Sequence, residues 1–351
     1  MKKNKLLLAS TILATALGMN NLASAEVNYV KSGVIDGAKL EIHKTIKNYD
    51  DDKVLMPNVI FKFNIKPDDS VVAGKKEEKS GLDIKPGIVD GLETSKEVSY
   101  TNSDKPNSKD KYTYFDFSQV TFTNVGIYRY VVEEVQDTVS GIHYDSQKWY
   151  IDVYVVEGDN GFVPKYIVSS KTLETKEPVL FSNSFDTTSL VVKKEVTGNT
   201  GDKTKNFKFQ LLLKENAYFS AGQKVSVTIT SEKASEVTTA TIGQPLIFEL
   251  KHNEQLKLDK LPVGITYQID ETSKNSDSYT TTATIQEGEQ SQNSYVLNSD
   301  KETDKSPDII TVTNKRDTQV PTGVVGTLAP FAVLSIVATG GVIYITKRKK
   351  A

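Results

Sequence analysis

Three residue types that can react with one another recur in the same order in both halves of the sequence. In each half, a lysine closes an early segment, a glutamate closes a tyrosine-containing segment, and an asparagine stands near the end of a late segment. The six segments are 38–44, 128–134 and 179–184 in the first half, and 189–194, 267–271 and 310–314 in the second. Such a repeat predicts two copies of one chemical site.

A lysine, a carboxyl group and an asparagine that meet in a protein core can form a covalent bond. Burial lowers the pKa of a lysine amine toward its neutral, nucleophilic form and raises the pKa of a carboxyl group toward its protonated form. The protonated glutamate can then donate a hydrogen bond to the asparagine carbonyl oxygen while the amine attacks the amide carbon. Ammonia leaves and a lysine–asparagine isopeptide bond remains, because fixed strands supply a high effective concentration.

The elements that must position these residues have the pattern of short β-strands. β-Branched and aromatic residues alternate with polar ones, without helical periodicity, and turn signals such as Asp159-Asn160-Gly161 separate the runs. The pattern predicts an all-β protein of two tandem Ig-like, antiparallel β-sandwich domains, with a boundary near Phe185-Asp186. In a sandwich the first and last strands can be neighbours, which would bring the lysine and the asparagine together.

The N-terminal residues 1–25 have the features of a signal peptide. A basic start precedes an apolar stretch from Leu6 to Leu17, and Ala23-Ser24-Ala25 places small residues before the expected cleavage site. A membrane anchor is the alternative interpretation, but the apolar stretch is short for a span. We therefore expect secretion, followed by a first domain over 26–185 and a second over 186–318.

The C-terminal residues 319–351 combine three parts. Val320-Pro321-Thr322-Gly323 precedes an almost uncharged stretch from Val324 to Thr346, whose length suits a transmembrane helix, and a basic tail follows at 347–350. This order resembles the sorting signal of Gram-positive surface proteins, which a sortase cleaves. The family pattern is Leu-Pro-X-Thr-Gly, and the chain has a Val-Pro-Thr-Gly form, so the sortase that reads it stays open. A single-pass membrane protein with a chance Pro-Thr-Gly is the alternative.

Composition excludes several functional classes. The chain has 351 residues, no cysteine and three scattered histidines, which leaves little for thiolate chemistry, zinc binding or triad hydrolysis. The body from 26 to 322 has 45 acidic and 36 basic residues, a formal charge of −9, which argues against nucleic acid as a partner. Asp50-Asp51-Asp52 is more typical of a solvated acidic loop than of a cation site. We expect no metal and no cofactor.

The repeated residues and the sorting signal together resemble the major (backbone) pilins of Gram-positive bacteria, most closely the streptococcal T-antigen pilins. The resemblance covers essentially the whole chain and implies Ig-like domains of the CnaB type. It also implies two isopeptide triads in which the glutamates promote the bond between lysine and asparagine. The triads are Lys44, Glu134 and Asn183 in the first domain and Lys194, Glu271 and Asn314 in the second.

Two adjacent residues compete for places in these triads. Glu133 precedes Glu134 and Lys193 precedes Lys194, and strand alternation lets only one of each pair face the core. Glu134 is preferred because it follows Tyr130 at the interval that separates Glu271 from Tyr267. Lys194 is preferred because Leu190 and Val192 share its parity and form an inward face.

The resemblance implies a structural subunit of a covalent pilus shaft that supports adhesion and colonisation. Sortase would cleave between Thr322 and Gly323 and join Thr322 to a lysine of the next subunit. Lys176 matches the linking lysine of the T-antigen-like pilins, and Lys165, in a Pro-Lys pair, is the alternative acceptor. The implied partners are further copies of the chain, other pilus subunits, sortase, peptidoglycan and the host-cell surface.

Two other functional classes are alternatives to the pilus subunit. A monomeric wall-anchored adhesin would bind a host ligand and attach Thr322 to peptidoglycan, without an acceptor lysine for polymerisation. An enzyme is not expected, because no catalytic histidine, cysteine or carboxylate pair is visible and isopeptide bonds would form once, without turnover. In either remaining class the protein would be secreted and anchored to the cell wall.

Overall fold

The computed structural model describes residues 33–318 with the exception of Asp52. The predicted signal peptide and the predicted sorting signal, with Val320, Pro321, Thr322 and Gly323, lie outside these residues. The described part is built from β-strands and includes a short 3-10 helix, η3 (Pro106–Ser108). No helix within it has the length and apolar character of a membrane span.

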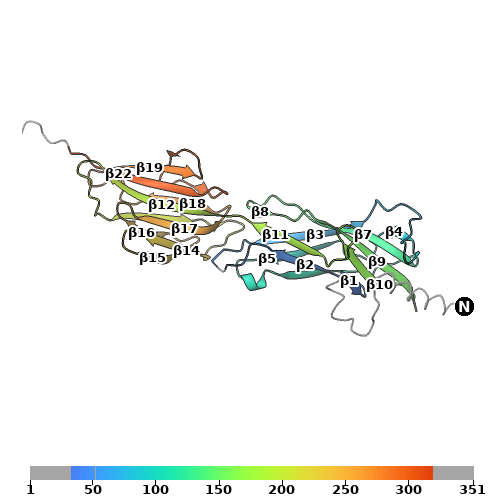
Figure 1. Cartoon of the computed structure of the whole chain (residues 1–351). Coiled ribbons are helices and arrows are strands. Elements are labelled where there is room, and N and C mark those ends of the chain that lie inside the picture. Colours follow the sequence, from blue (N-terminus) through green and yellow to red (C-terminus); the bar gives the residue numbers. More distant parts are fainter. Residues whose placement is uncertain (1–32, 52, 319–351) are drawn as a thin grey trace, which may run out of the picture.

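Strands β1 to β11 form a first sandwich of two sheets (Figure 1). The larger sheet has the order β1 (Val34–Asp36), β10 (Gly161–Ser170), β9 (Lys148–Gly158), β7 (Gly126–Glu134), β3 (Val59–Pro67) and β5 (Ser95–Tyr100), and β4 (Ile84–Pro86) pairs with β7. The smaller sheet has the order β6 (Lys111–Asp116), β2 (Lys39–Ile46), β11 (Leu180–Phe185) and β8 (Ile142–His143).

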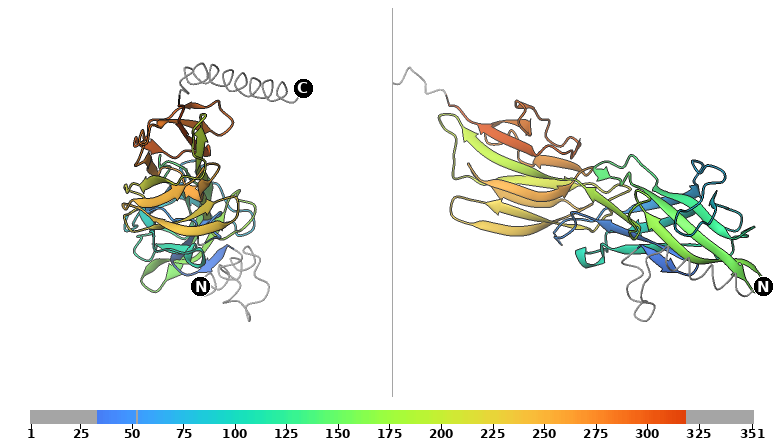
Figure 2. Two further views of the ribbon diagram at one scale, coloured as in Figure 1. Left: turned by 90° about the vertical axis from the view of Figure 1, so that its left-hand side faces the viewer. Right: turned by 45° about the vertical axis from the view of Figure 1, so that its right-hand side comes forward.

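Strands β12 to β22 form a second sandwich. Its larger sheet has the order β15 (Ser235–Thr241), β14 (Lys224–Thr230), β17 (Gln255–Pro262), β12 (Thr187–Thr197), β22 (Asp308–Lys315), β19 (Thr280–Glu287) and β20 (Asn293–Ser294). Its smaller sheet has the order β16 (Leu246–Leu250), β13 (Phe207–Leu213), β18 (Thr266–Glu271) and β21 (Lys301–Glu302). The two sandwiches lie end to end, so the described part of the molecule is elongated, as Figures 1 and 2 show.

In each sandwich a long strand near the start of the domain lies beside the last strand and runs parallel to it. In the first sandwich β2 pairs with β11, and in the second β12 pairs with β22. The predicted sandwiches are therefore confirmed, but the antiparallel pairing expected for them does not hold for these two pairs or for β4 with β7. A chain that begins and ends its domain in the same direction must place these two strands parallel if they are to pair.

Alternation along these strands decides which side chains enter the core. On β2, Leu40, Ile42 and Ile46 are buried together with Lys44, and the residues between them are less buried. On β12, Leu190, Val192 and Val196 are buried together with Lys194. A strand has a side-chain period of two, so each lysine shares a face with aliphatic residues and lies in the core with them.

The joint between the sandwiches is short and held by polar contacts. Asp186 alone separates β11 from β12. Its carboxylate contacts His143 Nε2 at 2.9 Å and Lys305 Nζ at 3.0 Å, one group from each sandwich. Asp51 also forms an ion pair with Lys260 across the joint. These contacts from both sides restrict how the two sandwiches can rotate about Asp186.

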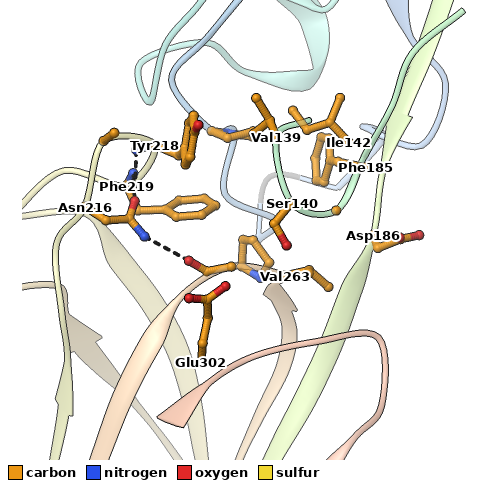
Figure 3. Close-up of a pocket in the computed structure, with 15 residues that line it drawn as sticks. Val139, Ser140, Ile142, Phe185, Asp186, Asn216, Tyr218, Phe219, Val263 and Glu302 are labelled. Atoms are coloured by element: carbon orange, nitrogen blue, oxygen red, sulfur yellow. Dashed lines mark hydrogen bonds between the residues drawn. The ribbon is translucent and has the colours of Figure 1, made fainter. Parts of the chain in front are cut away.

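A cleft of about 190 Å³ lies at this joint (Figure 3). Ile142 and Phe185 of the first sandwich and Phe219 and Val263 of the second supply apolar walls. Asn216 Nδ2 donates a hydrogen bond to the carbonyl oxygen of Gly264 at 2.8 Å, and this bond is one of the dashed lines at Asn216 in Figure 3. The cleft is mainly apolar and belongs to the packing of the joint.

Candidate functional site

The first lysine, glutamate and asparagine cluster is closed between the two sheets of the first sandwich. Lys44 on β2 and Asn183 on β11 belong to the smaller sheet, and Glu134 ends β7 in the larger sheet. Lys44 Nζ lies 2.8 Å from Glu134 Oε1, and Asn183 Nδ2 donates to the same oxygen at 3.1 Å. The exposed fractions are 0% for Lys44, 5% for Glu134 and 1% for Asn183, so the cluster is shielded from water.

The second cluster repeats this arrangement with the sheets exchanged. Lys194 on β12 and Asn314 on β22 belong to the larger sheet, and Glu271 ends β18 in the smaller one. Lys194 Nζ donates to Glu271 Oε2 at 2.9 Å, and Asn314 Nδ2 donates to Glu271 Oε1 at 2.6 Å. Lys194 Nζ also lies 3.4 Å from the carbonyl oxygen of Val312.

Register places the lysine and the asparagine diagonally on adjacent strands in both clusters. Lys44 is opposite Phe181, two residues before Asn183, and Lys194 is opposite Val312, two residues before Asn314. Residues two apart on a strand share a face, so each lysine and asparagine point into the same core. In both cases the glutamate approaches from the opposite sheet.

A pair of phenylalanines covers each lysine, and sequence reasoning missed both pairs. Lys44 Nζ lies 4.2 Å from the ring centroid of Phe61 and 5.9 Å from that of Phe63. Lys194 Nζ lies 4.3 Å and 5.7 Å from the ring centroids of Phe207 and Phe209. A signal was present, because Phe-Lys-Phe occurs at 61–63 and again at 207–209. These rings exclude water from the amine.

Burial shifts the pKa values of these side chains toward the protonation states that can react. It lowers the pKa of Lys44 to about 8, although the nearby Glu134 carboxylate opposes the shift. It lowers the pKa of Lys194 to about 8 against the opposing effect of Glu271. Burial also raises the pKa of Glu134 above its usual value, with Lys44 opposing. In the first cluster these two shifts lower the free-energy cost of moving a proton from the Lys44 amine to the Glu134 carboxylate.

The asparagines are oriented differently from the prediction. The predicted hydrogen bond joins the glutamate to the asparagine carbonyl oxygen, whereas in both clusters the amide nitrogen faces the carboxylate. Asn183 Oδ1 instead accepts the backbone N–H of Asp145 at 3.1 Å. Asn314 Oδ1 is buried and accepts no hydrogen bond within the described part of the chain. The glutamate is therefore placed to exchange protons with the lysine and with the amide nitrogen.

Comparison with known proteins identifies the family to which these clusters belong. A model of the Spy0128-like isopeptide-containing domain matches residues 40–186, and a model of a domain of unknown function (DUF7601) matches residues 188–316. A curated pilin of Streptococcus pyogenes serotype M1 is 39% identical over 347 residues, which cover 97% of this chain and 98% of that protein. The chain belongs to the streptococcal major pilins. This pilin is a structural subunit of a cell-surface pilus shaft, and the predictions of family, fold class and function are confirmed.

Solved structures agree with this assignment. The major pilin T3.2 of S. pyogenes is 48% identical, with a TM-score of 0.77, and the match covers 81% of this pilin and all of that chain. The major pilin T-13 of the same species is 43% identical, with a TM-score of 0.71, and the match covers 82% of this pilin and all of that chain. The similarity thus includes both sandwiches.

The competing residues Glu133 and Lys193 lie outside the core of the pilin. Glu133 contacts Lys66 at 3.0 Å and Lys148 at 2.7 Å, so its carboxylate is paired on the outer face of the sheet. Lys193 is exposed, whereas Lys194 is 0% exposed. Neither Glu133 nor Lys193 is in position to join the clusters.

The two candidate acceptor lysines have different surroundings. Lys176 lies in the loop between β10 and β11, bridges to Ser170 and is half-buried rather than fully exposed. Burial and the charge of Lys79 lower its pKa, which Glu77 opposes, and Lys176 forms no ion pair among the described residues. Lys165 is exposed on β10 and lies 3.1 Å from Asp36 Oδ1. Lys176 has the surroundings that favour a neutral amine.

The acidic loop is engaged by lysines instead of standing free. Asp50 pairs with Lys109, and Asp51 pairs with Lys260 of the second sandwich. Within residues 33–318 without Asp52, no group of three or more histidine, aspartate or glutamate side chains is arranged to hold a metal ion. Asp51 therefore contributes to the joint, whereas Asp50 is paired within the first sandwich.

Proposed function

We propose that this pilin is a shaft subunit whose domains, 26–185 and 186–318, are each locked by one internal isopeptide bond. The bonds join Lys44 to Asn183 and Lys194 to Asn314, and Glu134 and Glu271 promote them. One observation carries the proposal: two separate cores each hold a buried lysine paired with a glutamate that also contacts an asparagine on the adjacent strand. An unreacted buried ion pair stabilises a fold little, so its repetition in both domains favours a reactive role.

The reaction begins with a proton transfer from the lysine ammonium to the glutamate carboxylate. In the first domain these atoms are 2.8 Å apart, and burial shifts both pKa values toward the neutral pair. The neutral amine of Lys44 then attacks Cγ of Asn183, forming the new C–N bond and placing negative charge on Oδ1. Glu134 can return its proton to Nδ2 of Asn183, which lies 3.1 Å from Oε1.

The collapse of this intermediate breaks the bond between Cγ and Nδ2, and ammonia leaves. Of the three protons on the lysine ammonium, one remains on the new amide, one departs with ammonia, and one remains on Glu134 or converts ammonia to ammonium. No oxidant, metal or cofactor is needed. Each site reacts once because its lysine and asparagine are consumed, so we do not classify the pilin as an enzyme.

We further propose that sortase joins the subunits head to tail. Sortase would cleave between Thr322 and Gly323, within the motif Val320-Pro321-Thr322-Gly323, and the Thr322 acyl group would pass to the amine of Lys176 in the next subunit. The lowered pKa of Lys176 supports this acceptor over Lys165, whose amine is paired with Asp36. The finished shaft would be linked to peptidoglycan, carry other pilus subunits and present its surface to host cells.

Intact-mass measurement of the soluble fragment 26–322 tests the internal bonds. We expect it to be lighter than its sequence mass by two molecules of ammonia. Glu134→Ala and Glu271→Ala should each restore one, because each removes the proton acceptor of one site. An unmodified mass in the folded wild-type fragment would refute the bond chemistry.

A further inference from the structure

The two clusters differ at the atom where negative charge must develop. Asn183 Oδ1 lies 3.1 Å from the backbone nitrogen of Asp145, whose N–H also points to Glu134 Oε2 at 2.7 Å. In the second cluster, Asn314 Oδ1 is buried without a hydrogen-bond donor in the described part of the chain. The residue types in the two triads are identical, so this difference arises from the surrounding backbone.

The side chain of Asp145 fixes its own backbone N–H against the cluster. Asp145 Oδ2 accepts the N–H of Ser182 at 2.8 Å, and Oδ1 accepts the N–H of Gln147 at 2.9 Å. Its carbonyl accepts Gln136 Nε2 at 2.9 Å. Ser182 directly precedes Asn183, so one side chain ties the loop between β8 and β9 to the strand that carries the reacting amide.

We propose that Asp145 completes the first isopeptide site: its backbone N–H is the oxyanion donor for Asn183 Oδ1, and its carboxylate is the positioning group that holds this donor in place. The inference rests on the proposed isopeptide bond and adds a component that has no counterpart at the second site among residues 33–318 without Asp52. A donor already aimed at the developing charge stabilises the transition state without reorganisation, and removal of one such donor typically slows a reaction by about 10²- to 10³-fold.

The geometry also divides the work at the first site. Glu134 faces the two nitrogens, Lys44 Nζ and Asn183 Nδ2, and so handles the protons. The Asp145 N–H is shared between Glu134 Oε2 at 2.7 Å and Asn183 Oδ1 at 3.1 Å, so it can stabilise negative charge as that charge moves from the carboxylate to the amide oxygen. Negative charge on Asp145 itself raises the pKa of Lys44, which disfavours the amine, but this effect is small beside burial and Glu134. The hydrogen-bonding role is therefore the dominant contribution of Asp145.

A refolding experiment with two sites in one molecule tests this role. The fragment 26–322 is isolated unfolded in denaturant, and its mass is measured to show that it is uncrosslinked. Dilution into buffer starts refolding, and samples are quenched with acid at intervals. After proteolysis, mass spectrometry measures the amount of each crosslinked peptide pair. In Asp145→Ala, we expect the Lys44–Asn183 bond to form on the order of 100-fold more slowly. The Lys194–Asn314 bond should keep its wild-type rate.

Two matched variants separate positioning from general damage. Asp145→Asn keeps an oxygen that can accept the Ser182 N–H, so we expect its first bond to form within about tenfold of the wild-type rate. Gln147→Ala keeps the backbone N–H that donates a hydrogen bond to Asp145 Oδ1. It removes a side chain whose one hydrogen bond within the described residues is to the carbonyl oxygen of Lys148 at 2.6 Å. It should react like the wild type.

Each outcome decides between the two proposals. Wild-type rates in Asp145→Ala, equal slowing in the alanine and asparagine variants, or equal slowing of both bonds would overturn the role of Asp145 while leaving the isopeptide bonds intact. Absence of ammonia loss at both sites in the folded wild type would instead overturn the proposed function.

A measurement without substitution covers the case in which Asp145→Ala does not fold. Hydrogen exchange of the wild-type fragment should show the Asp145 amide protected to the level of the neighbouring strands, because it is bonded inside the cluster. Exchange at the rate of an exposed loop amide would overturn the assignment of the donor.

Discussion

Replacing Asn314 with alanine isolates the contribution of one internal bond to stability. Asn314 is 1% exposed. Before the bond forms, its side chain contacts the charged pair through a hydrogen bond from Nδ2 to Glu271 Oε1 at 2.6 Å. The Lys194–Glu271 pair at 2.9 Å remains, so no buried charge loses its partner. The variant therefore removes the covalent link and leaves an unreacted Lys194 amine that is still paired with Glu271.

The expected loss follows from the length of the closed loop. A crosslink between residues about 120 positions apart restricts the unfolded chain by about 5 kcal/mol in the chain-entropy model. With an unfolding entropy of about 2.1 cal/mol/K per residue over a domain of about 130 residues, this loss of about 5 kcal/mol lowers the Tm of the second sandwich by about 18 °C.

Differential scanning calorimetry of the fragment 26–322 measures this shift. The transition of the first sandwich serves as an internal reference, and Asn293→Ala, at an exposed asparagine on β20, is the matched control and should move the Tm by less than about 2 °C. A second transition within about 5 °C of the wild type, together with a mass still lighter by two molecules of ammonia, would refute the assignment of Asn314.

Two further predictions concern assembly and pH. Lys176→Arg should abolish the ladder of covalent oligomers in cell-wall extracts, because a guanidinium does not lose its proton and cannot attack an acyl intermediate. The control variant Lys165→Arg should still form the ladder. A ladder that persists in Lys176→Arg would show that another residue is the acceptor. The rate at which the Lys44–Asn183 bond forms during refolding should have a bell-shaped dependence on pH, since Lys44 and Glu134 must share one proton. The rate falls in acid because both groups are then protonated. It falls above pH about 8 because both groups are then deprotonated. Mass spectrometry of quenched samples follows this rate, and a rate that still rises at pH 10 would contradict the glutamate's role.

Strand periodicity made part of the sites predictable from the sequence. Lys194 has the parity of Leu190 and Val192, and a period of two then requires it to enter the core while Lys193 faces outward. The same reasoning, with the Tyr130 interval, separated Glu134 from Glu133. These inferences need only the local pattern of a strand, which the sequence states directly.

Other features depend on contacts between distant segments, which periodicity does not contain. The parallel pairing of β2 with β11 follows from the path of the whole domain. Asp145 lies in a loop, and its role depends on Ser182 and Asn183 being brought beside it by β11. The asparagine orientation was wrong in the prediction for the same reason, because the backbone donor that takes Asn183 Oδ1 is 38 residues away in the sequence.

The strand order indicates that the two proposed bonds bear load differently in a shaft. If tension enters at Lys176, it passes along β11, through Asp186 and into β12 without crossing the Lys44–Asn183 bond. From β12 it can pass through the Lys194–Asn314 bond to the parallel strand β22 and leave near 318, so the remaining strands of the second sandwich lie outside the path. The second bond would thus carry tension in series, while the first would keep β11 attached to β2 and to the core around Phe63 and Phe181. This division agrees with the joint, where Asp186 is held by His143 and Lys305 and lies directly on the path between the two sandwiches.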